Sequence, residues 1–238
     1  MTTFEQAWQL ASSIEGWLTE SQGRALFEAG GQLAPGTVAV EIGSHRGKSA
    51  VLIGLGLPSN GRLLAVDPFD DPRWGGGAES LEMFRTALEV AGVTDRVDLY
   101  RGLSEEASAT WNGPLVGFLW VDGAHDRIST LKDFDGWMPH MAIGGLIYVH
   151  DAFSAVGTTR AVLERFLFSR HVVYEGCERT MVKFRVGTAS PMVRLLSALR
   201  LLRRLGFFSR MVAIKVARRR GLHAWERRFM RVENEPLI

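Results

Sequence analysis

Five short apolar runs, separated by amphipathic stretches, constrain the fold of this chain most strongly. Each run has the length of a strand, and the runs comprise residues 38–42, 63–66, 97–100, 116–121 and 146–149. Helices are expected at 47–55, 80–91, a short stretch from 105, 128–138 and 159–168. Strands that alternate with helices predict a parallel sheet with helices on both faces. Runs that are almost wholly apolar are typical of strands covered on both sides.

Two β-like runs follow the last of these helices. They cover 171–174 and 181–186 and are separated by the sequence EGCERT, so they are predicted to form an antiparallel hairpin with a six-residue connection. The sequence therefore indicates a doubly wound α/β domain with an antiparallel element at its end.

Charge and helical patterning divide the chain into three parts. Residues 1–36 are expected to form two helices, residues 37–186 the sheet domain, and residues 190–238 a basic helical extension. The extension carries a formal charge of +9, whereas residues 1–189 carry −7. Its arginines at 194, 200, 203 and 204 alternate with leucines, which predicts an amphipathic helix, and a second basic helix is expected at 210–220.

The basic extension has three possible partners. It can pack against the body or against a second subunit, it can contact an anionic membrane surface, or it can bind an acidic polymer or nucleic acid. Packing, with homo-oligomerisation as one form of it, is the favoured interpretation. Nucleic acid is the least favoured, because no stacking aromatic residues separate the arginines of 194–204.

Three negative features bear on location. No run of 18 apolar residues is present, so no spanning helix is expected. The first residues carry acids where a signal peptide would carry positive charge. Cys177 is the single cysteine, so no internal disulfide is possible. We therefore expect a cytoplasmic location.

The segment from Glu41 to Ser49, EIGSHRGKS, contains the first candidate binding motif. A strand ends, a loop containing Gly43 and Gly47 turns, and a helix begins. Open α/β sheets bind ligands at the carboxyl ends of their strands, glycines allow a close approach, and a helix N-terminus offers N–H groups to an anion. The alternative is a tight turn that binds nothing.

Asp67 follows the second predicted strand. An acid at this position can hydrogen-bond both hydroxyls of a ribose. Nicotinamide-dependent enzymes use the same device, so Glu41 and Asp67 together predict an adenosine-containing ligand without identifying it. The oxidoreductase interpretation predicts G-x-G-x-x-G after the first strand, a pattern that the G-S-H-R-G of this chain lacks.

Polar residues also follow the fourth and fifth predicted strands, as VDGAHD and VHDA. Neighbouring strands would bring Asp122 and Asp151 to one rim, where two carboxylates suit Mg²⁺. His125 lies three residues after Asp122 and is a candidate general base. His150 is either a ligand or a core histidine, and Asp126 and Asp133 are expected at the surface or as helix caps.

The five motifs in order, EIGxxxGxS, VDP, GxS, VDGxHD and GGxxxxHD, resemble the class I S-adenosylmethionine-dependent methyltransferases. Within them the chain is similar to the metal-dependent O-methyltransferases of macrolide sugars and to the rhamnosyl O-methyltransferase group, and more narrowly to the actinobacterial 1-O-methyltransferases of methylmannose polysaccharide synthesis. The resemblance implies a Rossmann-like sheet of seven mostly parallel strands with a terminal antiparallel strand, S-adenosyl-L-methionine, and Mg²⁺ or another divalent metal.

The resemblance also implies roles for individual residues. The metal ligands would be Asp122, His150 and Asp151, and His125 would be the catalytic base. The cofactor-binding residues would be Glu41, Gly43, Ser44, Gly47, Ser49, Asp67, Ser104 and Asp122, with Ser104 at the adenine. His150 departs from the macrolide enzymes, which carry an acid there, and an imidazole is a poorer ligand for Mg²⁺ than a carboxylate. Either His150 binds a softer metal, or it faces the substrate, or two aspartates and waters hold Mg²⁺.

The sequence thus predicts methylation of a sugar or glycoside hydroxyl. A catechol-type small-molecule O-methyltransferase and a non-catalytic cofactor-binding module are the alternatives. The retained pairs Asp122–His125 and His150–Asp151 argue against the module, which would not need them.

Overall fold

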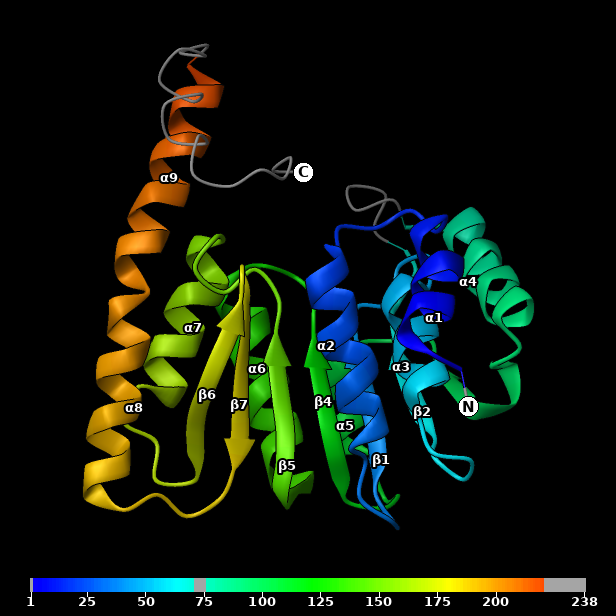
Figure 1. The fold of residues 1–238 in the computed structure, drawn as a ribbon, viewed down its shortest axis with the longest axis horizontal. Coiled ribbons are helices and arrows are strands. Elements are labelled where there is room, and N and C mark those ends of the chain that lie inside the picture. Colours follow the sequence, from blue (N-terminus) through cyan, green and yellow to red (C-terminus); the bar gives the residue numbers. More distant parts are fainter. Residues whose placement is uncertain (1, 71–75, 221–238) are drawn as a thin grey trace.

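A seven-stranded sheet forms the centre of the molecule in the computed structural model, which describes residues 2–70 and 76–220 (Figure 1). Its strand order is β3-β2-β1-β4-β5-β7-β6. The strands are β1 (Val38–Ile42), β2 (Leu63–Val66), β3 (Val97–Tyr100), β4 (Val116–Val121), β5 (Met141–Val149), β6 (Val172–Glu178) and β7 (Met181–Val186). β1 to β5 pair in parallel, and β7 is antiparallel to both β5 and β6. The predicted Rossmann-like α/β fold is confirmed.

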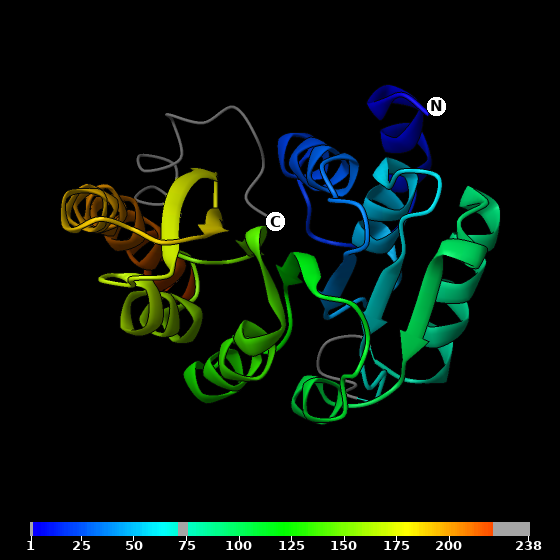
Figure 2. The ribbon, with the colours of Figure 1, turned by 90° about the horizontal axis from the view of Figure 1, so that it is seen from below.

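Helices cover both faces of this sheet (Figure 2). Residues of α1 (Phe4–Ser12), α2 (Glu20–Gly31), α3 (Lys48–Gly56) and α4 (Ala78–Ala91) share one hydrophobic cluster on one face. Residues of α5 (Ser104–Ala109), α6 (Arg127–Trp137) and α7 (Val156–Phe166) form a second cluster on the other face. The inner strands β1, β2 and β4 are almost wholly buried, which explains why their sequences are nearly all apolar.

The two N-terminal helices belong to the core of the fold. Each begins at a capping box, with Thr3 and Thr19 as the N-cap residues. α2 packs tightly on α3, because a Cβ added at Gly56 would lie 2.2 Å from the carbonyl oxygen of Phe27. Glycine at this crossing lets the two helix backbones approach each other.

The C-terminal helices α8 (Pro191–Arg203) and α9 (Leu205–Arg219) lie at the β6 edge of the sheet (Figure 1). The Ser197 hydroxyl of α8 accepts a hydrogen bond of 2.9 Å from the backbone N–H of Tyr174 in β6. The rest of the predicted extension, residues 221–238, lies outside the described residues. Among the helices that the structure describes, none is long and apolar enough to cross a membrane.

Three predicted boundaries were wrong. β5 begins at Met141, five residues before the apolar run that predicted it, because the strand continues through Gly144 and Gly145. β6 continues to Glu178, so most of EGCERT is strand and only two residues connect β6 to β7. Residues 175–178 of β6 are exposed or half-buried, which agrees with their more polar sequence. α9 begins at residue 205, not at 210.

Candidate functional site

The carboxyl ends of β1, β2, β4 and β5 meet at one edge of the sheet. Backbone hydrogen bonds extend the pairing beyond the strands, from Gly43 N–H to Val66 O (2.9 Å), from Asp122 N–H to Ile42 O (2.8 Å), and from His150 N–H to Val121 O (3.0 Å). The first residues after these strands are therefore held in register with one another. The predicted convergence of the motifs at one edge is confirmed.

Glu41 is a wholly buried acid near the end of β1. Neither of its carboxylate oxygens has a hydrogen-bond partner among the described residues. Burial raises the pKa of Glu41 to about 8, although the nearby hydroxyls of Ser49 and Ser44 oppose the rise. A buried carboxylate without a partner is costly, so this position is built for a cationic or hydrogen-bond-donating ligand.

The loop after β1 depends on its two glycines. Gly43 has φ +86°, and a Cβ there would lie 2.2 Å from the backbone oxygen of Asp122. Gly47, the N-cap residue of α3, has φ +91° and packs against Phe84. Both backbones lie in the left-handed region that side chains disfavour. The glycines therefore let the loop pass close to the end of β4.

Asp67 is already engaged with this loop. One of its carboxylate oxygens accepts hydrogen bonds of 2.9 Å from the backbone N–H groups of both Ser44 and His45, and the other accepts one of 2.7 Å from Phe69. The N–H groups expected to meet an anion are thus partly used by Asp67. Each carboxylate oxygen can accept more than one hydrogen bond, so Asp67 keeps the capacity to bind a ribose as well.

Ser104 begins α5 and is buried. Its hydroxyl accepts a 3.0 Å hydrogen bond from the indole Nε1–H of Trp137 in α6. The expected contact with an adenine stays a prediction, because this hydroxyl already has an indole partner in the structure.

Asp133 is a buried acid that sequence reasoning placed wrongly at the surface or at a helix cap. It lies on the inner face of α6, beside Ser104 and beneath Gly123. Burial raises its pKa to about 7, while Ser104 opposes the rise. Its spacing from Thr130, Phe134 and Trp137, which are also buried, is the helical signal that predicts an inward position. Asp126 is the N-cap residue of α6, as expected.

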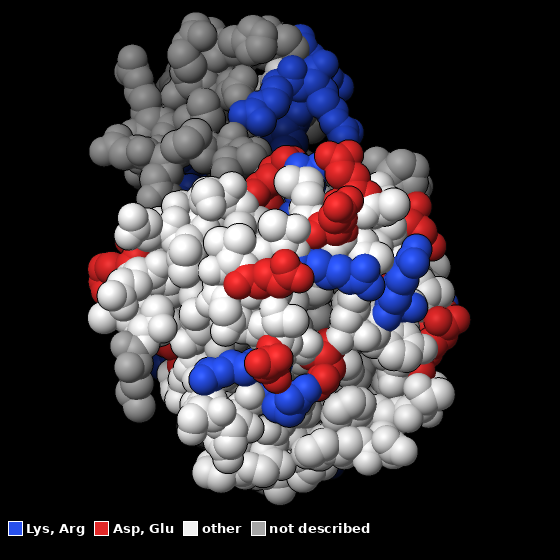
Figure 3. All heavy atoms as spheres, turned by 90° about the vertical axis from the view of Figure 1, so that its right-hand side faces the viewer, with Lys and Arg blue, Asp and Glu red and all other residues white. Residues whose placement is uncertain are grey.

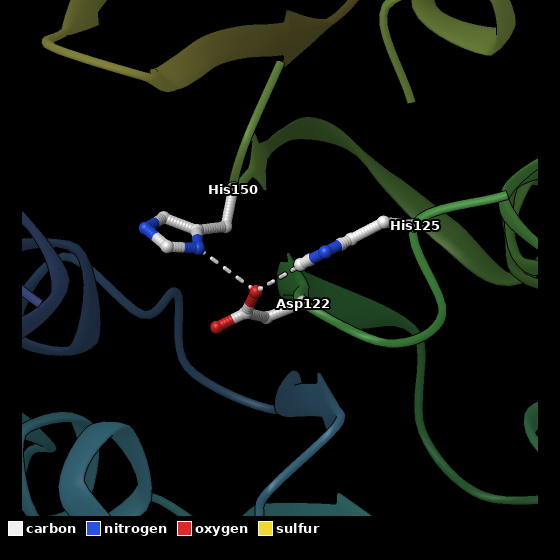
Figure 4. A group of neighbouring side chains, drawn as sticks. All are labelled: Asp122, His125 and His150. Atoms are coloured by element: carbon white, nitrogen blue, oxygen red, sulfur yellow. Dashed lines mark hydrogen bonds and ion pairs between the residues drawn. The ribbon is translucent and has the colours of Figure 1, made fainter. Parts of the chain in front are cut away.

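Asp122 lies between two histidines (Figure 4). Its Oδ1 is 2.9 Å from Nδ1 of the buried His150 and 3.6 Å from Nε2 of His125. Burial alone would raise the pKa of Asp122 and lower that of His150. Their mutual attraction outweighs this effect, so the pKa of Asp122 falls and that of His150 rises. The pair is therefore an ion pair across the ends of β4 and β5.

His125 is held between two carboxylates. Its Nδ1 lies 3.7 Å from Oδ2 of Asp151, on the side opposite Asp122. Burial lowers the pKa of His125, but Asp122 and Asp151 together raise it above the ordinary value of 6.5. About a third of its side chain is exposed, although its Nε2 atom is buried. Asp151 itself is fixed by a 2.6 Å hydrogen bond from the hydroxyl of Ser154.

The group that could hold a metal ion comprises Asp122, His125 and His150, whose ligand atoms all lie within 4.8 Å of one another. It shares Asp122 and His150 with the predicted set and contains His125 in place of Asp151. Nε2 of His150 is buried and has no hydrogen-bond partner among the described residues. Two imidazoles and one carboxylate fit a transition metal better than Mg²⁺, which prefers oxygen ligands.

Comparison with known proteins agrees with this geometry. Residues 40–152, which span the whole carboxyl edge, match the model of a family described as a methyltransferase domain. This part of the chain, somewhat less than half of it, is therefore similar to a methyltransferase domain. It is also 31% identical over 128 residues to tricin synthase 1 of Oryza sativa subsp. japonica. That match covers 50% of this chain and 46% of the relative, so it spans about half of each protein.

Solved structures show the same fold. A putative O-methyltransferase from Klebsiella pneumoniae aligns with a TM-score of 0.59 at 17% identity, covering 78% of this chain and 90% of that one. The O-methyltransferase TomG from Streptomyces achromogenes, solved in complex with SAM, aligns with a TM-score of 0.56 at 17% identity, covering 78% and 88%. The described sheet and its flanking helices are therefore those of the Rossmann-like methyltransferase fold.

Proposed function

We propose that this protein is an S-adenosylmethionine-dependent O-methyltransferase that methylates a hydroxyl of a sugar or glycoside. The observation that carries the proposal is the buried, unpartnered carboxylate of Glu41 beside the Gly43 loop. The ammonium group of the methionine moiety would supply its missing partner. Asp67, at the end of the neighbouring strand, would receive the ribose. The methyltransferase-domain match over these same residues supports this assignment.

His125 is the proposed general base. The methyl group is activated by the cofactor itself, so the chain has to align the acceptor oxygen and remove its proton. The carboxylates of Asp122 and Asp151 stabilise the imidazolium that forms when His125 takes the proton. A sugar hydroxyl is a weak acid, and a base strengthened by two carboxylates suits such an acceptor.

A divalent metal is the second part of the proposal. Asp122 and His150, with Asp151, would hold it, and it would supply Lewis acidity that lowers the pKa of the acceptor hydroxyl. The imidazole of His150 favours a metal softer than Mg²⁺. Because His125 belongs to the same cluster, its role as base has to be separated from a role as ligand.

The variant His125→Ala separates these roles. We expect turnover to fall about 10²- to 10⁴-fold, while the affinity for S-adenosylmethionine and the metal content, measured by calorimetry and by elemental analysis, stay close to those of the wild type. Asp126→Ala, which removes the N-cap carboxylate of α6 directly after His125 in the chain, is the control and should keep its turnover. Loss of the metal from His125→Ala would show that His125 is a metal ligand. Unchanged turnover of this variant would refute the role of His125 as the base.

A catechol-type small-molecule acceptor is the second candidate. The 31% identity to tricin synthase 1, an enzyme named for a small-molecule product, favours it. Transfer of labelled methyl groups to a panel of sugars, glycosides and catechols distinguishes the two. Preferential methylation of catechols would overturn the sugar assignment and leave the assignment of the cofactor intact.

A further inference from the structure

The outward face of α8 is unusually apolar for a surface helix. Six large apolar side chains of this 13-residue helix are exposed, namely Met192, Val193, Leu195, Leu196, Leu199 and Leu202. The side turned toward β6 is made of the smaller Ser197 and Ala198 together with Leu201. The helix therefore packs on the body through a narrow face and leaves four of its five leucines outside.

Basic residues accompany this apolar face. Between residues 191 and 219 the chain has eight Arg or Lys and no Asp or Glu. Arg200 and Arg203 are exposed on α8, beside the leucines. An apolar helical face with basic flanks and no acids matches a helix that lies in the surface plane of an anionic membrane, with its leucines below the headgroups and its arginines among them.

We propose that α8, continued by α9, binds the surface of a membrane that contains anionic lipids. The helices stand at the β6 edge, outside the rest of the body, so a flat surface can reach them (Figure 1). The opposite edge, formed by α1 and α4, has acidic and basic side chains interspersed (Figure 3) and offers no such uniform charge.

A second copy of the chain fits this face less well. In a two-fold dimer the same patch meets itself. Arg200 and Arg203 would then lie against a second basic patch of the same composition, and α8 and α9 contain no acid to neutralise them. Anionic headgroups provide the missing negative charge.

Sedimentation of the full chain with vesicles tests this proposal. We expect binding to vesicles of phosphatidylcholine with phosphatidylglycerol, little binding to phosphatidylcholine alone, and weakening as salt screens the charges. The double variant Leu195→Gln/Leu199→Gln should bind at least about tenfold more weakly, because each leucine that enters the interface adds substantially to affinity. Arg200→Gln/Arg203→Gln should lose roughly fivefold for each arginine.

The control is Val90→Gln/Ile143→Gln, which removes two still more exposed apolar side chains outside α8 and α9 and should bind like the wild type. Equal thermal unfolding of all variants would show that they are folded. Absence of wild-type binding to anionic vesicles, or unchanged binding of both α8 variants, would overturn the proposal. So would a wild-type dimer that Leu195→Gln/Leu199→Gln converts to a monomer without any vesicle binding, because a second copy would then cover the face.

Discussion

Replacement of Glu41 by Gln should stabilise the protein while removing its capacity to bind the cofactor. The carboxyl group titrates at about 8 in the folded protein against an ordinary value of 4.5. At about 1.4 kcal/mol for each pH unit of difference, ionisation of buried Glu41 costs the fold about 5 kcal/mol. In the folded protein Glu41 keeps its proton up to about pH 8, whereas in the unfolded chain it ionises above about pH 4.5.

The sign follows from linkage. Between pH 4.5 and 8 the unfolded chain releases the Glu41 proton and the folded chain retains it, so the wild type loses stability as the pH increases. Glu41→Gln does not titrate. Moving from about pH 5 to about pH 8.5, we expect the wild type to lose about 4 kcal/mol relative to this variant.

Urea unfolding of the cofactor-free proteins at both pH values measures this difference, and other titrating groups cancel in it. Glu89→Gln, which removes an exposed carboxylate of α4, is the matched control and should follow the wild type. S-Adenosylmethionine should stabilise the wild type and not Glu41→Gln. Parallel pH profiles for the wild type and Glu41→Gln would refute the claim that Glu41 is buried and unpartnered.

Three further substitutions have definite expected outcomes. Gly43→Ala, with its Cβ against the Asp122 carbonyl, should cost at least ~1–2 kcal/mol in thermal unfolding and weaken cofactor binding, because the loop must move. Asp151→Asn should shift the acid limb of the kcat/KM profile to lower pH, since it removes one of the two carboxylates that raise the pKa of His125; an unshifted limb would mean that His125 is not the titrating base. Asp126→Ala should cost ~1 kcal/mol through loss of the α6 cap with unchanged turnover, and a large loss of turnover would place Asp126 in the site.

The sequence predicted those parts of the fold that depend on local pattern. β1, β2, β3 and β4 begin and end where the sequence predicts them, and the inner strands β1, β2 and β4 are largely apolar because helices cover both of their faces. The prediction ended the edge strand β6 at residue 174, because the partly exposed residues that follow, 175–178, are polar and resemble a turn. The two glycines within β5 concealed the start of that strand for a similar reason.

The candidate site was predictable to the extent that chain position determines it. Residues that follow neighbouring parallel strands must converge, and Gly43, Asp67, Asp122 and His150 do. Side-chain partnerships are a different matter, because they depend on rotamers and on packing between elements distant in sequence. For this reason the hydrogen bonds from the β1 loop to Asp67 required the structure, whereas the burial of Asp133 could have been predicted from its helical spacing.

Calorimetric titration of the wild type with S-adenosylmethionine and S-adenosylhomocysteine, with NAD as the control, tests the central claim most directly. We expect both sulfur cofactors to bind, NAD not to bind, and Glu41→Gln to lose affinity for both. Failure of either cofactor to bind the folded wild type, or binding of NAD in their place, would contradict the assignment of the carboxyl edge as a methyl-donor site.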